Sequence, residues 1–227
     1  MKRFLDKLIP VRARIPLATE VVINLLAFYL TRVFTSSAVH HDLSLGIDAE
    51  IPFLPVFILF YFAAYLQWGL SFLAAARDAE DRANSFFFAM TVSKVIAAAF
   101  FILLPTTMTR PEVTGGGLFS ALVRFIYSVD SPDNLFPSIH CLESWICFRY
   151  SLKRSGRFGF WQVLHLVFTL GVFASTVLVK QHVAVDIIAG VAVAEASILL
   201  TSAMKGYRVF SRINDITVSK VLSYEKK

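Results

Sequence analysis

Six long apolar runs, separated by charged segments, constrain the fold of this chain more than any other feature of the sequence. A helix needs about 20 mostly apolar residues to cross the hydrocarbon core of a bilayer. The runs lie roughly at residues 17–34, 52–76, 85–104, 137–153, 158–179 and 182–204. With 56% hydrophobic and only 17% charged residues, the chain of 227 residues is too apolar for a soluble domain. We therefore expect an all-α integral membrane protein, a single domain (1–227) formed by a six-transmembrane-helix bundle.

Basic residues are distributed unevenly between the two sides that such helices define. Lysines and arginines near helix ends resist translocation, so the richer side is expected to be cytoplasmic. Both termini and a basic tail at 205–227 fall on that side, and we predict that the protein resides in the cell membrane. The net charge of +6 matches the anionic lipids of an inner leaflet, so no nucleic-acid partner is expected. The basic residues that fall elsewhere are Arg32, Lys94, Arg110, Arg124 and Lys180.

The segment 105–136 is predicted to be an outer, extracytoplasmic loop that contributes to the active site. Loops of this length are usually functional or disordered. It contains three consecutive glycines, Gly115 to Gly117, for which a flexible linker is one interpretation. The residues that follow place Leu118, Leu122 and Phe125 on one helical face, which predicts a short interfacial helix.

Two residues at the start of the last apolar run have the spacing of a nucleophilic imidazole and the carboxylate that orients it. His182 and Asp186 are four residues apart, so on a helix the carboxylate lies one turn from the imidazole on the same face. A carboxylate bonded to one ring nitrogen fixes the tautomer, leaves the other lone pair free and stabilises positive charge on the ring. His182 is therefore a candidate nucleophile.

The sequence Pro-Ser-Ile-His at 137–140 opens the fourth predicted helix. Free backbone N–H groups and the helix dipole favour an anion such as phosphate at this position. Ser138 can cap the helix and bind phosphate at the same time. His140 can donate a proton to a leaving alkoxide as a general acid.

Three basic residues on the extracytoplasmic side are candidate phosphate ligands. Arg110, helped by Arg124 or Lys180, would neutralise charge on the phosphoryl oxygens in the transition state. The alternative for Arg110 is an interfacial anchor of the third helix. For Arg124 and Lys180 the alternative is an isolated charge in a solvated loop.

These motifs resemble those of the type 2 phosphatidic acid phosphatase superfamily, which includes lipid phosphatases and, more distantly, the inositol phosphorylceramide and sphingomyelin synthases. Their order, spacing and six-helix frame agree from about Ser85 to Met204. The resemblance implies that His182 attacks phosphorus, Asp186 supports it and His140 protonates the leaving group. It also implies a lipid phosphate substrate within membrane lipids, with no metal and no cofactor. The matching residues are Arg110-Pro111, Pro137-Ser138-Ile139-His140, Ser175, His182 and Asp186.

Two positions depart from the phosphatase pattern, which has a lysine seven residues before the first-motif arginine and an arginine directly after the third-motif serine. Here these positions are Leu103 and Thr176. Either Lys180 and Arg124 replace the two cations, or phosphate is bound as in the synthase branch. The triplet at 180–182 resembles the synthases more closely than the phosphatases. The leading hypothesis is a phosphatase with a phosphohistidine intermediate. The alternative is a phosphotransferase that moves a phosphoryl or phosphoalcohol group onto a lipid hydroxyl; the sequence fixes neither the headgroup nor the oligomeric state.

Lys94 and Glu143 fall within predicted spans, where charges are costly unless they are paired. We expect them to pair with each other, or Glu143 to tune His140 three residues before it. A remote alternative is a transporter in which the histidines and carboxylates bind a metal or relay protons. The chain shows no internal repeat, and Ser138 has no evident role as a ligand there, so an enzyme is favoured.

Overall fold

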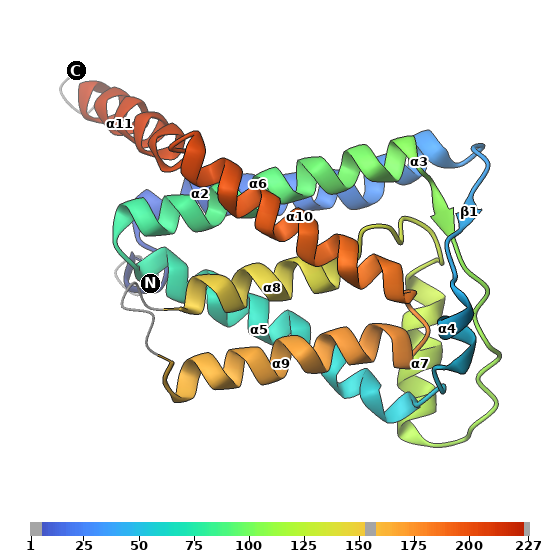
Figure 1. Ribbon diagram of the computed structural model, residues 1–227. Helices are drawn as coiled ribbons and strands as arrows, with labels where there is room; N and C mark the ends of the chain where they lie inside the picture. Colours follow the sequence, from blue (N-terminus) through green and yellow to red (C-terminus); the bar gives the residue numbers. More distant parts are fainter. Residues whose placement is uncertain (1–5, 153–157, 225–227) are drawn as a thin grey trace.

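The structure, a computed structural model, describes residues 6–152 and 158–224, with no side chains described from 217 onward (Figure 1). Several predicted cytoplasmic lysines and arginines, at 1–5, 153–157 and 225–227, lie outside these residues. Two short strands, β1 (His41–Asp42) and β2 (Thr106–Thr107), pair in parallel. The helices are α2 (Val11–Leu25), the π-helix η1 (Leu26–Leu30), α3 (Thr31–Thr35), α4 (Gly46–Glu50), the 3-10 helix η2 (Pro55–Phe57), α5 (Ile58–Arg77), α6 (Glu80–Leu103), α7 (Leu118–Val129), α8 (Ile139–Ser151), α9 (Phe160–Leu178), α10 (Ala184–Ala203) and α11 (Tyr207–Tyr224).

The prediction of spanning helices is confirmed for five of the six runs, which indicates an integral membrane protein. The continuous helix Val11–Thr35, the helix Pro55–Arg77, α6, α9 and α10 are long and apolar enough to cross a bilayer. The fourth run, expected at 137–153, forms a helix of only 13 residues, α8. At about 1.5 Å per residue it extends about 20 Å, less than the ~30 Å hydrocarbon core. A short helix is tolerated because α5, α6, α9 and α10 surround α8, and backbone shielded by protein needs no lipid-facing helix.

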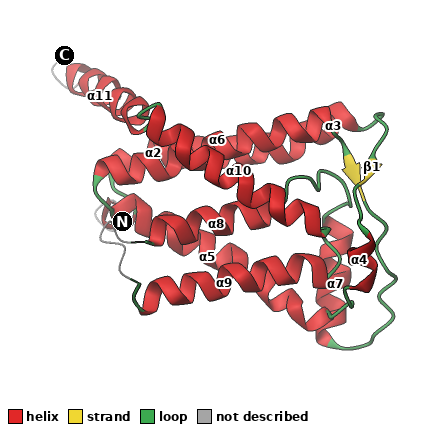
Figure 2. Cartoon of the chain, viewed as in Figure 1, coloured by secondary structure: helices red, strands yellow, loops and turns green. Residues whose placement is uncertain are grey.

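The long helices run alternately towards and away from one end of the bundle (Figure 1). The short helices α4 and α7 and the β1–β2 pair lie at that end, while the start of α2 and all of α11 lie at the other. Figure 2 shows the connecting loops at the first end. The expected short helix after the glycines is present as α7, which lies across the direction of the long helices and exposes Leu118, Phe125 and Val129.

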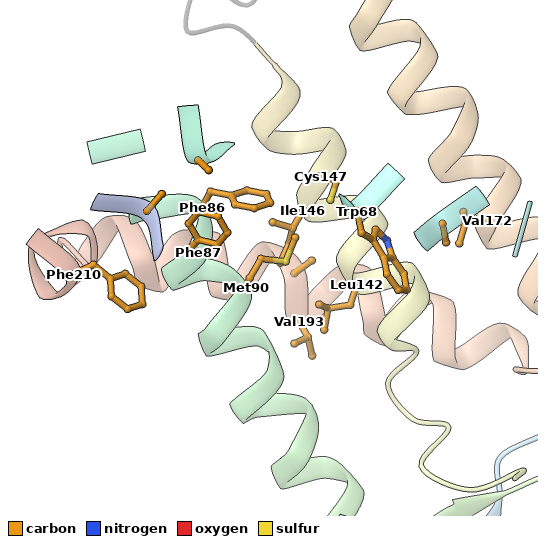
Figure 3. Packing of buried hydrophobic residues seen from close by; sticks show 14 residues of the cluster. Trp68, Phe86, Phe87, Met90, Leu142, Ile146, Cys147, Val172, Val193 and Phe210 are labelled. Carbon is orange, nitrogen blue, oxygen red and sulfur yellow. The ribbon is translucent and has the colours of Figure 1, made fainter. Parts of the chain in front are cut away.

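The two largest clusters of buried apolar side chains among the described residues hold the elements in place. The larger joins α5, α6, α8 and α10, with Trp68, Phe87 and Leu142 among its members (Figure 3). The smaller joins α5 to α7 and to the end of α9, through Tyr61, Val123 and their neighbours. Because burying a large apolar side chain contributes about 1.5–3 kcal/mol, these contacts fix α7 against the bundle and so position the loop that precedes it.

Lys94 and Glu143 form an ion pair inside the bundle, as predicted from their burial in apolar runs. Glu20 is a second partner, with its Oε1 3.9 Å from the Lys94 ammonium nitrogen. All three side chains are buried, and they come from α6, α8 and α2. Among the described side chains, Glu143 has its contact with Lys94 and no hydrogen bond to His140, so the pairing is favoured over the tuning role.

Gly190 allows α10 to cross close to the start of α8. A Cβ at this position would lie 2.8 Å from the Ser138 carbonyl oxygen and 3.3 Å from the Leu142 amide nitrogen. Since backbone atoms cannot rotate away, we expect Gly190→Ala to push the helices apart and lower stability by about 1–3 kcal/mol. Thermal melting in detergent measures this. The matched control is Gly69→Ala, where a Cβ meets nothing within 4 Å, and equal melting temperatures for the two variants would contradict the expectation.

Candidate active site

His182 lies in the turn between α9 and α10, and hydrogen bonds to both helices fix its orientation. Its backbone N–H donates to the Thr176 carbonyl at 3.0 Å. Its Nδ1 lies 3.1 Å from Asp186 Oδ2, which also accepts the Val183 N–H at 3.1 Å. The spacing of four residues thus gives the expected contact. With Nδ1 bound to a buried carboxylate, Nε2 is the nitrogen available to attack.

His140 is brought beside His182 by a link between α8 and α10. Ser138 is fully buried; its Oγ accepts the Cys141 N–H at 3.4 Å, and its own N–H donates to the Asp186 carbonyl at 3.1 Å. The ring centres of His140 and His182 are 6.2 Å apart. Both rings line one cavity, which Ser138 does not reach. Ser138 therefore acts here as a cap at the start of α8, the helix that carries His140.

Aromatic side chains of α5 surround His140. The Tyr61 ring stacks on it with centroids 4.2 Å apart, and the rings of Tyr65 and Trp68 lie at 5.7 and 5.2 Å. Within the described residues neither ring nitrogen of His140 has a hydrogen-bond partner. Packing rather than hydrogen bonding orients this imidazole, which leaves it free to exchange a proton with a substrate. In the sequence, positions 61, 65 and 68 have the spacing of residues on one helical face, and this pattern is the signal that indicates the aromatic group.

Arg110 is held beside the His182 turn by two hydrogen bonds and a ring contact. Its guanidinium donates to the Asp130 carbonyl and to the Gln181 side-chain oxygen, and it lies over the Tyr127 ring at 4.7 Å. Burial lowers the pKa of Arg110, while Asp130 raises it; the ordinary arginine pKa is so high that the charge persists. The buried Nε has no hydrogen-bond partner in the described part of the chain, so one donor remains for an anion.

Lys180 lies near the site, but its ammonium group is engaged elsewhere. It donates to the carbonyls of Asp48 and Ile51 at 2.8 and 2.6 Å, while its side chain lines a cavity together with Arg110 and His182. The Asp48 carboxylate in turn accepts the Ala184 N–H at 2.7 Å. The short helix α4 is therefore attached to both sides of the turn that carries His182, a role for Asp48 that the sequence did not indicate.

The structure does not place Arg124 beside the two histidines and Arg110. Its guanidinium donates to the carbonyls of Val113 and Gly115 and lines neither cavity beside His182. The side chain lies on the face of α7 that turns towards its own loop. The two positions that depart from the phosphatase pattern add no cation either, because Leu103 is 82% exposed at the end of α6 and Thr176 is buried.

Two cavities adjoin His182. The first, of about 230 Å³, also borders His140 and side chains of the first long helix, α5 and the 130–135 segment. The second, of about 450 Å³, borders Arg110, Lys180 and α4 but not His140. A leaving alcohol that takes a proton from His140 would occupy the first cavity. The second adjoins His182 together with the two cationic side chains.

A comparison with protein families agrees with this geometry. A sequence model described as the PAP2 superfamily matches residues 30–200, which include both histidines, Asp186 and Arg110. No curated protein and no solved structure gives a significant match. The resemblance drawn from the motifs is thereby confirmed, and it supports phosphoryl-transfer activity on lipid phosphates in general terms. The chain belongs to the PAP2 superfamily.

Proposed function

We propose that this protein is a membrane phosphatase that hydrolyses a lipid phosphate through a phosphohistidine on His182. One observation carries the proposal: an imidazole bonded to a buried carboxylate at 3.1 Å shares a cavity with a second imidazole 6.2 Å away. From the distribution of basic residues, the termini are cytoplasmic and the cavity faces the extracytoplasmic side. The substrate is accordingly a lipid of the outer leaflet.

The reaction proceeds in two displacements at phosphorus. In the first, Nε2 of His182 forms a bond to phosphorus while the bond to the lipid oxygen breaks, and His140 gives that oxygen a proton. Asp186 stabilises the positive ring, and Arg110 neutralises charge on the non-bridging oxygens. In the second, His140 takes a proton from water, the oxygen attacks phosphorus, and inorganic phosphate leaves His182. The cycle uses no cofactor.

A phosphotransferase is the second candidate, and two observations favour it. The chain lacks cations at Leu103 and Thr176, so it is less suited to a phosphomonoester with two negative charges than to a phosphodiester with one. The second cavity beside His182 and Arg110 could hold the headgroup of such a diester. A lipid hydroxyl in the first cavity would then replace water as acceptor.

A labelling experiment separates the two functions. Purified protein in lipid nanodiscs receives either a ³²P-labelled lipid phosphomonoester or a headgroup-labelled phospholipid, each with and without diacylglycerol as acceptor. A phosphatase releases inorganic phosphate from the monoester whether or not the acceptor is present. A transferase labels the added acceptor, whose acyl chains have a length that no donor lipid carries. The labelled product is a phosphomonoester when the label comes from the monoester and a phosphodiester when it comes from the phospholipid headgroup. Protein with His182→Ala controls for contaminating enzymes, and transfer of neither label by the unmodified protein would count against both functions.

A further inference from the structure

The cavity that contains His140 borders the lipid-facing surface between the first long helix and α5. Leu25 and Tyr29 on the first helix and Tyr65 on α5 line it, and they are 50%, 61% and 50% exposed. These helices are long and apolar enough to cross a membrane, so side chains exposed along them face lipid tails. The cavity is therefore open to the bilayer, and a lipid could reach His140 by lateral movement.

Three polar groups line this lipid-facing part of the cavity without partners. The Asn24 amide and the hydroxyls of Tyr29 and Tyr65 make no hydrogen bond to any residue that the structure describes. An amide or hydroxyl left unpaired in an apolar environment loses the hydrogen bonds that it would make to water, which is unfavourable. The proposed reaction does not use these groups. They line the cavity beside the apolar side chains Leu25, Phe28 and Trp68, and their convergence there indicates that a ligand satisfies them.

The part of the first long helix that carries Asn24 and Tyr29 is attached to the segment that precedes His140. Just beyond them, Arg32 forms ion pairs with Asp130 and Asp133, which precede His140 in the chain. Asn134 donates to Thr31 Oγ1 at 2.9 Å. The intervening turn, Leu26–Leu30, is a π-helix, a distortion that often occurs at functional sites.

The depth of Tyr65 along α5 matches the chemistry of a membrane lipid. Tyr61 stacks on His140, and Tyr65 lies one turn further along α5, about 6 Å deeper at about 1.5 Å per residue. In a phospholipid or sphingolipid, the ester carbonyls, or the amide and hydroxyl, lie just below the phosphate and above the hydrocarbon chains. A phosphate between the histidines would place these linkage groups near Tyr65, in the cavity that Asn24 and Tyr29 also line.

We propose that Asn24, Tyr29 and Tyr65 form a binding site for the polar linkage groups of a lipid that enters from the side of the membrane. The site accepts hydrogen bonds from, or donates them to, ester, amide or hydroxyl groups, and so selects true membrane lipids over simple alkyl phosphates. The inference rests on the proposed function and adds a determinant of its substrate class.

The test compares two substrates of equal chain length in nanodiscs, a diacylglycerol phosphate and an alkyl phosphate without linkage groups. The measured quantity is the ratio of their kcat/KM values, each corrected by the His182→Ala background. Because a site built to hydrogen-bond a substrate rejects analogues that lack the group, we expect Asn24→Leu to lower the ratio about tenfold, and Tyr65→Phe to lower it several-fold while retaining the ring. Thr19→Leu, a polar-to-apolar change on the same helix away from either cavity, should leave the ratio unchanged.

The outcomes distinguish the two proposals. If both cavity variants fold and the ratio stays within twofold of the unmodified protein, the linkage site is wrong, while turnover that depends on His182 leaves the phosphatase intact. An equal loss with both substrates also overturns the linkage site, because it indicates a general structural effect. If the unmodified protein turns over neither substrate in a manner that depends on His182, both proposals fail.

Discussion

Replacing His182 by alanine is expected to lower kcat by a factor on the order of 10³ or more for every lipid phosphate. Without the imidazole no phosphohistidine can form, and the remaining groups offer only weak activation of water. The fold should survive, because Asp186 still accepts the Val183 N–H and the His182 backbone bond to Thr176 is retained. Release of labelled phosphate, measured with the melting temperature of the same sample, checks both points.

The control variant for this prediction is His140→Asn, which removes the proposed acid and keeps the nucleophile. With a nitrophenyl ester, whose leaving group needs little protonation, we expect His140→Asn to recover much of its lost rate in the first displacement, whereas His182→Ala should remain inactive. A His182→Ala protein that retains more than a tenth of normal turnover would exclude the phosphohistidine.

Replacing Lys94 by methionine is expected to lower the free energy of unfolding by about 3–5 kcal/mol. The change leaves Glu143 and Glu20 buried without a counter-charge, and an uncompensated buried charge is strongly destabilising. Methionine has similar length and apolar character, so loss of packing contributes little. The melting temperature in detergent is the measurement.

A variant that removes all the charges of Lys94, Glu20 and Glu143 separates the effect of charge on stability from the effect of side-chain shape. Combining Lys94→Met with Glu20→Gln and Glu143→Gln removes all three charges, and we expect it to recover a large part of the lost stability. If Lys94→Met alone melts at the temperature of the unmodified protein, the ion pair does not stabilise the bundle.

Hydropathy and local spacing predicted much of this structure, because both report on interactions within one helix. Apolar runs located the spanning helices, and the spacing of four located the contact between His182 and Asp186. The length of α8 was missed, since Pro137 and Ser138 belong to the run by composition but form an extended cap. The closeness of His140 to His182 depends on Gly190 and on a backbone bond between two helices, neither of which local spacing reveals.

Contacts between distant segments could not be read from the sequence. The neighbours of Arg110 and Lys180, namely Gln181 and Asp48, depend on loops whose path is set by tertiary packing. The direction of Arg124 depends on how α7 is rotated against the bundle. The approach of Glu20 to Lys94 follows from the rotation of two helices about their axes, which no local pattern encodes.

The shortness of α8 has a consequence for how the protein responds to its membrane. Every residue of α8 is buried or half-buried, so the helix that carries His140 is enclosed by protein. When a bilayer thickens or thins, helices in contact with lipid tilt to match it. Because the Ser138 backbone bond attaches the enclosed α8 to α10, His140 should move together with α10 when that helix tilts, so the separation of the two imidazoles should persist in membranes of different thickness.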